Sequence, residues 1–201
     1  MVPPRDTLFD CENGFLFWST SGGTVASPIG HMVVGVGVAG AAAGALGLHT
    51  TPTLWAGAAV ASCLPDLDLI PRLWGVSFRR THRKATHSIL VLVPFVGLSW
   101  LVAHAFQLPL ELQLVVAWTA ALLSHLVLDI LSTGPVLGRQ GHGIPLFWPL
   151  THRRWFVREP IFLEVNLLEQ ITPGLLVQTC LREVVHLGPA SGALLFLGHL
   201  L

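Results

Sequence analysis

Two aspartates in the stretch LPDLDLIP, residues 64–71, stand out because they follow an almost wholly apolar segment. Asp66 and Asp68 are two positions apart and have prolines on both sides. Two such close carboxylates repel each other, and each resists losing its water. Their position therefore indicates a compensating partner, with the capping or hydrogen bonding of a turn as the simpler alternative.

A second pair, His125 and Asp129, lies inside the apolar run LLSHLVLDIL. At a spacing of four residues the two side chains share one helix face. An aspartate at the centre of a membrane helix costs about 2.5–3.5 kcal/mol on insertion scales. A divalent cation relieves this cost, and imidazole with carboxylate is a common ligand set for Zn, Mn or Fe. The pair therefore predicts a metal site.

The cysteines argue against a thiolate site. The three of them, Cys11, Cys63 and Cys180, are far apart and form no CxxC motif, which disfavours a disulfide framework or a structural zinc site. Carboxylate-rich sites more often leave positions open for water, so we expect catalysis in preference to a closed structural centre.

Composition places the chain in a membrane. Of its 201 residues, 52% are hydrophobic and only 11% are charged, with a mean hydropathy of +0.67. An ordinary soluble domain has roughly 25% charged residues. The formal net charge is zero, so no nucleic-acid partner is expected. Ten histidines are unusual in such a chain and need an explanation.

Hydropathy predicts an all-α, polytopic membrane bundle. A membrane helix needs about 20 apolar residues, and four apolar segments are assigned as core transmembrane helices: 28–48, 52–65, 86–106 and 109–131. The second is short and spans only if it includes the turn into LPDLDLIP. A Gly/Pro-rich loop follows from residue 132, then an amphipathic segment at 161–187 and an apolar one at 189–201, too short to span alone. Whether this C-terminal helical part crosses the membrane stays open.

The chain is expected to form one domain. Residues 28–201 make the single membrane-embedded domain, and residues 1–27 make a flexible or interfacial N-terminal extension. Small residues at Gly40 and Gly44 in the first segment would permit close helix packing.

Positive charge gives the orientation. Nine of the eleven basic residues lie in the loops after the second and fourth segments: Arg72, Arg79, Arg80, Arg83, Lys84, Arg139, Arg153, Arg154 and Arg158. By the positive-inside rule, both loops and the N-terminus face the cytoplasm of a multi-pass inner-membrane protein. This topology brings seven side chains to one membrane face: His31, Asp66, Asp68, His82, His87, His125 and Asp129. Any one of these histidines alone would read as an ordinary interfacial residue.

Five motifs in this order carry a resemblance: SPIGH, LPDLDLIP, HRKATHS, SHLVLDILST and GIPLFWPL. Together they resemble the YdjM-type family, described as membrane-bound metal-dependent hydrolases, some regulated by LexA, over about residues 27–160. The His-x-x-x-Asp pattern is also similar to the zinc-dependent phospholipase C and single-strand nuclease superfamily. The resemblance implies the helical ligand pair His125 and Asp129, an aspartate at Asp68 or Asp66, and histidines at His82 or His87 and at His31.

The resemblance and the residues together lead us to expect a metal-dependent hydrolase of a phosphoester in a membrane lipid or related amphiphile. Zinc is the expected metal, with Mn or Fe as alternatives. One or two ions would hold the attacking water through Asp68, His125 and Asp129, and Asp129 would bridge two ions about 3.5–4 Å apart. The expected substrate-binding residues are Arg79, Arg80, Arg83, Lys84, His142, Arg153 and Glu164. A positive-inside role alone would explain the four basic residues at 79–84 about as well.

Two alternatives stay open. A divalent-cation transporter would use the cluster as a transit site, although transport sites usually lie near the membrane midplane. A non-catalytic protein would use a structural metal to tie its helices together. The lipid bilayer is the expected partner, and the sequence does not give the oligomeric state.

The orientation can be tested with single cysteines in place of Arg79 and Arg153. Because both loops are expected inside the cell, neither cysteine should react with a membrane-impermeant thiol reagent added to intact cells. Labelling of either position from outside would contradict both the topology and the shared metal-binding face.

Overall fold

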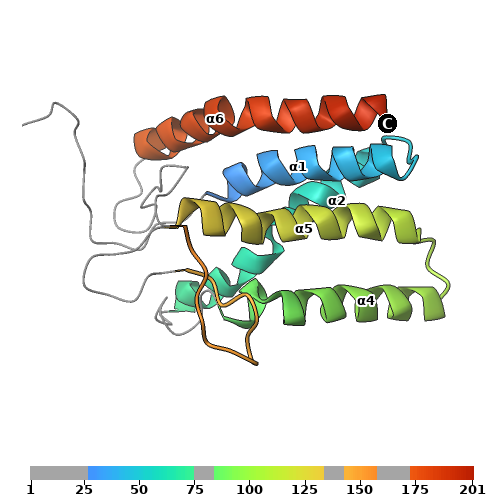
Figure 1. The fold of residues 1–201 in the computed structure, drawn as a ribbon, viewed down its shortest axis with the longest axis horizontal. Helices are drawn as coiled ribbons and strands as arrows, with labels where there is room; N and C mark the ends of the chain where they lie inside the picture. The colour runs from blue at the N-terminus through green and yellow to red at the C-terminus, as the bar shows by residue number, and fades with distance from the viewer. Residues whose placement is uncertain (1–26, 75–83, 134–142, 158–172) are drawn as a thin grey trace, which may run out of the picture.

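The computed structural model describes residues 27–74, 84–133, 143–157 and 173–201. These residues form the helices α1 (Pro28–Ala45), α2 (Pro52–Cys63), α4 (Ile89–Ala105), α5 (Leu112–Ser132) and α6 (Pro173–Leu200), with 3-10 segments η1 (Leu64–Trp74) and η2 (Ala85–His87). In the described part of the chain the only β pairing is an isolated bridge between Ile144 and Trp155. The all-α prediction is confirmed for these residues (Figure 1).

Local sequence sets where the first two helices begin. Ser27 and Thr51 are N-cap residues whose side chains accept hydrogen bonds from the backbone amides of Gly30 and Leu54. A proline follows each cap, at the first helical position, where its missing N–H costs nothing. These signals place His31 in the first turn of α1.

Helix α5 is the centre of the bundle. It packs against α1, α2 and α4, while α6 packs along α1 (Figure 1). Alanines form much of the core, among them Ala39, Ala58 and Ala121, and their small side chains let α1, α2 and α5 approach closely. The loops at 46–51 and 106–111 lie at one end of the bundle, and the start of α1 and the end of α5 lie at the other.

The interface between α1 and α6 depends on glycine. A Cβ added at Gly44 would overlap the backbone carbonyl of Gly198, and one at Gly40 would overlap Leu195. Ser191 of α6 donates a hydrogen bond of 2.6 Å to the carbonyl oxygen of Val33. The small residues predicted to permit close packing thus lie where α6 meets α1.

The prediction of four core transmembrane helices is wrong. Among the residues that the structure describes, three helical stretches are long and apolar enough to cross a membrane: Pro28–Ala45, Leu112–Ser132 and Cys180–Leu200. Helix α2 has 12 residues, so at 1.5 Å per residue it is about 18 Å long against a hydrocarbon core of about 30 Å. Helix α4 is apolar but has only 17 residues, and it falls just short of a span because residues 85–88 are used in η2 and the turn after it.

The C-terminal part is one continuous helix where the sequence indicated two segments. Helix α6 runs through Pro189, at the point where the amphipathic segment was expected to end. Proline is tolerated within membrane helices because neighbouring groups satisfy the freed backbone. Because the sequence prediction divided the segment near this proline, it missed the candidate membrane span at Cys180–Leu200.

Replacing Gly44 by alanine should destabilise the protein by about 1–3 kcal/mol, because the new methyl group overpacks against the α6 backbone. Gly192→Ala on α6 is the matched control, since a Cβ there meets nothing within 4 Å. It should leave the unfolding midpoint in detergent unchanged or raise it. Equal midpoints for the two variants would contradict the close α1–α6 contact.

Candidate metal centre

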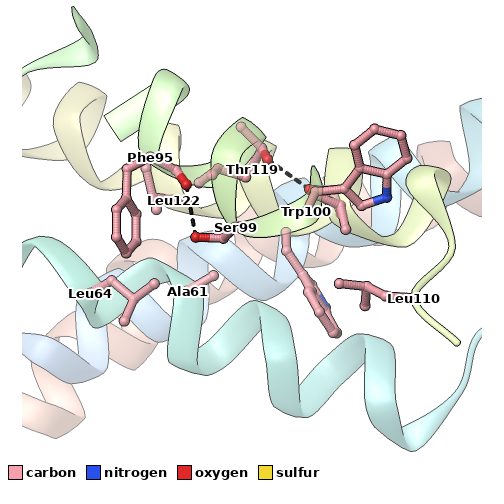
Figure 2. Close-up of a pocket in the computed structure, with 11 residues that line it drawn as sticks. Ala61, Leu64, Phe95, Ser99, Trp100, Leu110, Thr119 and Leu122 are labelled. Carbon is pink, nitrogen blue, oxygen red and sulfur yellow. Dashed lines mark hydrogen bonds between the residues drawn. The ribbon is translucent and has the colours of Figure 1, made fainter. Parts of the chain in front are cut away.

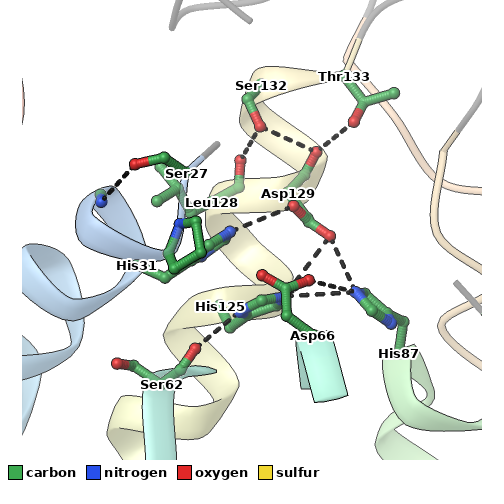
Figure 3. Close-up of polar contacts among 12 residues, drawn as sticks. Ser27, His31, Ser62, Asp66, His87, His125, Leu128, Asp129, Ser132 and Thr133 are labelled. Atoms are coloured by element: carbon green, nitrogen blue, oxygen red, sulfur yellow. Dashed lines mark hydrogen bonds and ion pairs between the residues drawn. The ribbon is translucent and has the colours of Figure 1, made fainter. Parts of the chain in front are cut away.

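Five buried or nearly buried ionisable side chains meet at one end of the bundle (Figure 3). They come from four segments of the chain: His31 from α1, Asp66 from η1, His87 from η2, and His125 and Asp129 from α5. All five belong to the set that the sequence predicted to converge. The structure thus brings together five of the seven side chains that the predicted topology placed at one membrane face.

The i, i+4 pair on α5 is the core of the cluster. His125 and Asp129 are both fully buried and project from the same helix face. The rings of His31 and His125 stack with centroids 3.6 Å apart, and His31 Nε2 lies 3.6 Å from Asp129 Oδ1. The other carboxylate oxygen, Oδ2, lies 3.3 Å from His87 Nε2. The two oxygens of Asp129 thus face different histidines.

The separations between these side chains suit an ion among them. Two ligand atoms about 2.0–2.1 Å from a tetrahedral zinc ion lie roughly 3.3 Å apart. His87 Nε2 lies 3.3 Å from His125 Nε2, and Asp66 Oδ1 lies 3.6 Å from His125 Nε2 and 3.9 Å from His87 Nε2. These distances are at or slightly above the zinc value, so small side-chain movements would bring the atoms to bonding distance.

Two sets of three potential ligands result. One is His31, His125 and Asp129, and the other is Asp66, His87 and His125; within each set one ligand atom per residue lies within 4.8 Å of the others. The sets share His125, whose Nδ1 is 2.7 Å from the carbonyl oxygen of Ser62. Because that hydrogen bond requires a proton on Nδ1, only Nε2 can bind an ion. His125 could therefore serve only one of the two sets at a time.

Asp68 lies on the far side of the His87 ring from the cluster. Thr86 Oγ1 donates a hydrogen bond of 2.5 Å to the Asp68 carboxylate and lies 3.0 Å from His87 Nδ1. Nδ1 can therefore donate to Thr86, which leaves the Nε2 lone pair directed toward the cluster. A carboxylate behind a ligating histidine in this way fixes the ring and its tautomer. Of the two aspartates in LPDLDLIP, Asp66 faces the cluster and Asp68 supports His87.

The field around His87 favours positive charge. Burial alone lowers the pKa of His87, but hydrogen bonds to Asp129 and Asp68 outweigh it and raise the pKa to about 9. Carboxylates that stabilise an imidazolium at this point also favour a metal cation among the same groups. Binding such a cation would displace the proton from the ring.

Glu183 of α6 supports the cluster from behind and was not identified from the sequence. Its carboxylate accepts hydrogen bonds from the backbone amides of Ser27 (2.7 Å) and Gly30 (3.1 Å), and from the Ser27 hydroxyl. It therefore caps the start of α1 in the turn that carries His31. A single acid in an amphipathic stretch gave no signal of this role.

The motif GIPLFWPL has a structural role at the same end. The Ser88 hydroxyl lies 2.6 Å from the carbonyl oxygen of Trp148, and the amide of Ile89 donates to the carbonyl of Leu146 (3.0 Å). At the end of this loop the amide of Val157 lies 3.2 Å from the carbonyl oxygen of Thr133. The loop 143–157 thus joins the segment after His87 to the end of α5.

The expected substrate-binding residues are mostly outside the cluster or undescribed. Lys84 is exposed, and the guanidinium of exposed Arg153 lies 5.0 Å from the centre of the Trp155 ring. Among the described residues, neither Lys84 nor Arg153 makes a hydrogen bond or ion pair with the five central side chains. The remaining predicted ligands and contacts lie outside the described residues: Arg79, Arg80, His82, Arg83, His142 and Glu164.

Comparison with known proteins identifies the family. The model of the YdjM inner membrane protein family matches residues 27–199. The match includes α6, and so extends beyond the range 27–160 over which the motifs carried the resemblance. Searches found no significant match among curated proteins or solved structures.

His125→Ala and Asp129→Ala should each remove stoichiometric metal from protein purified without added metal, because each deletes a ligand at the centre of the cluster. Elemental analysis of the purified protein measures this directly. His49→Ala is the control, since this exposed histidine follows α1 at the opposite end of the bundle. Full occupancy in both cluster variants would refute the metal site.

Replacing the two aspartates of LPDLDLIP should lower metal affinity to different extents. Asp68→Ala should weaken metal affinity by about 10–100-fold, as expected for a residue that only supports a ligating histidine. Asp66→Ala deletes a ligand and should weaken it more. Competition with a chelator measures both affinities, and the opposite order would contradict the placement of Asp68 behind His87.

Proposed function

Since the chain belongs to the YdjM inner membrane protein family, we propose that it is a membrane-bound, metal-dependent hydrolase. Its substrate would be a phosphoester in a membrane lipid or related amphiphile. The observation that carries the proposal is the pair of overlapping His/Asp sets, drawn from four chain segments at one end of an apolar bundle.

The donor set favours catalysis over a closed structural site. The set Asp66, His87 and His125 offers three protein ligands, as catalytic zinc sites do, whereas structural zinc sites usually have four and are often built from thiolates. When bound, a divalent metal would lower the pKa of a water molecule and polarise a phosphoryl oxygen. Zinc is the preferred metal, and one or two ions would fit the donor chemistry.

The chain's own groups hold the reacting region in a fixed arrangement. The hydrogen bond to Ser62 fixes the His125 ring, and Thr86 with Asp68 fixes the His87 ring. Asp129 directs one oxygen toward His31 and the other toward His87. Such preorganisation keeps ligand geometry constant while charge develops on a phosphoester.

The position of the cluster supports an interfacial substrate. The five side chains lie where α1 begins and α5 ends, not halfway along either helix. A transport site would more often lie near the midplane of the membrane. We place this end at the cytoplasmic face, because the loops richest in Arg and Lys leave the helices there.

His31 is the most informative residue for the proposed reaction. His31→Ala should abolish release of phosphate or phosphoalcohol from phospholipids and generic phosphoesters, while the helical signal and at least one bound ion remain. The reason is that Asp66, His87 and His125 still form a complete set without His31. His49→Ala should keep wild-type activity.

Two other outcomes would refute the hydrolase, and a third would refute the role of His31. Metal flux into vesicles without hydrolysis would indicate a transporter. A structural site would be indicated by two results together. The metal-loaded wild-type protein would show no hydrolytic activity, and His31→Ala would lower only the unfolding temperature. Hydrolysis that persists after His31→Ala at the wild-type rate would remove this histidine from the reaction.

A further inference from the structure

An apolar pocket of about 220 Å³ lies between α2, α4 and α5 (Figure 2). Its lining includes Ala61 of α2, Leu64 of η1, Phe95 and Ser99 of α4, and Thr119 and Leu122 of α5. For comparison, an engineered cavity of about 150 Å³ in another protein binds benzene. The pocket is therefore large enough for part of an organic ligand.

The chemistry of the lining selects an apolar ligand. The Ser99 hydroxyl donates to the carbonyl of Phe95 in its own helix (2.8 Å), and the Thr119 hydroxyl donates to that of Val115 (2.7 Å). The indole N–H of Trp118, which also lines the pocket, donates to the carbonyl of Leu54 (3.1 Å). These three donors are used within the protein, whereas the buried indole N–H of Trp100 in the same lining has no hydrogen-bond partner in the described part of the chain. Apart from that one group, the pocket offers a ligand mainly carbon surface.

One end of the pocket adjoins the metal-ligand cluster. Leu64 is two residues before Asp66, and Leu122 is one helical turn before His125. Ala61 immediately precedes Ser62, whose carbonyl holds the His125 ring. From Leu122 the lining continues along α5 to Val115, which at 1.5 Å per residue is about 10 Å farther from the cluster.

The pocket is also accessible from the side of the bundle that faces lipid. Phe95 in its wall has 60% of its surface exposed, and α4 exposes further large apolar side chains, including Leu98 and Leu101. An alkyl chain could therefore enter from the bilayer without crossing water.

We propose that this pocket binds the fatty-acyl chain of the amphiphile whose polar head reaches the metal-ligand cluster. The identity of the polar head group rests on the proposed function. The binding of an acyl chain rests on the pocket itself. A ligand held in this way lies parallel to α5, with its hydrocarbon beside Thr119 and its head beside His125. The pocket thus makes a long alkyl chain part of what the site recognises.

Binding can be tested separately from hydrolysis. The full-length protein is reconstituted in phosphatidylcholine vesicles with a trace of a diacyl phosphonate, which resists hydrolysis and carries a diazirine midway along one acyl chain. After illumination, mass spectrometry maps the labelled residues. Labels should concentrate on the pocket-facing parts of α4 and α5, including Val96 and Thr119, and should saturate as the probe concentration rises.

Thr119→Phe should reduce this labelling about tenfold, because the added ring occupies the pocket. Gly97→Phe on α4 is the matched control, since a Cβ at Gly97 meets nothing within 4 Å, and it should leave labelling unchanged. If Thr119→Phe does not fold, competition on the wild-type protein replaces it. An unlabelled long-chain phosphonate should then displace the label, and a butyryl analogue should not.

The labelling experiment tests the acyl-chain site independently of the proposed hydrolysis. Uniform, unsaturable labelling along the lipid-facing surface would show that bulk lipid alone is captured, and would overturn the pocket even if the protein hydrolyses phosphoesters. Saturable labelling of the pocket in a protein without hydrolytic activity would support the acyl-chain site while refuting the hydrolase. In an active enzyme, Thr119→Phe should raise KM for long-chain substrates about tenfold and leave that for short-chain ones unchanged.

Discussion

The Asp129 carboxylate has no exposed surface and lies near the end of an apolar helix, where an uncompensated charge would cost several kcal/mol. The surrounding structure compensates for it. His31, His87 and His125, each from a different segment or turn, present ring nitrogens within 3.3–3.8 Å of its oxygens. This buried anion explains why imidazoles gather at one end of a chain so poor in charge. A cation among these groups would satisfy several of them at once, which a single proton on His87 cannot do.

Helix packing fixes the positions of the histidines that surround the Asp129 carboxylate. His31 reaches Asp129 only because α1 lies close to α5, and Glu183 of α6 holds the first turn of α1 through two backbone amides. Glycines at 40 and 44 allow α6 to lie against α1 along its length. On the opposite side, the loop 143–157 fixes the segment after His87 through the Ser88 hydroxyl. Contacts between segments far apart in the sequence thus help to position the nitrogen and oxygen atoms that could hold a metal ion.

The polar cluster and the apolar pocket occupy successive depths along α5. His125 and Leu122 are one turn apart, and the side chains change from polar imidazole to hydrocarbon across that turn. An amphiphile has the same order of polarity along its own length. A bilayer would supply the proposed substrate, and it would also cover the large apolar side chains that α4 and α6 expose.

The sequence by itself determined the all-α class, the family, and the pairing of His125 with Asp129, because hydropathy and an i, i+4 spacing act within one helix. It also brought His31, His87 and the LPDLDLIP aspartates to one end, since alternating helix direction follows from segment order. Only the tertiary structure decided that Asp66 faces the cluster while Asp68 lies behind His87, that Glu183 caps α1, and that α6 continues through Pro189. Each of these three findings depends on which segment of the chain packs opposite a given side chain. Helix periodicity specifies the face of a helix on which a side chain lies, but not the neighbour packed against that face.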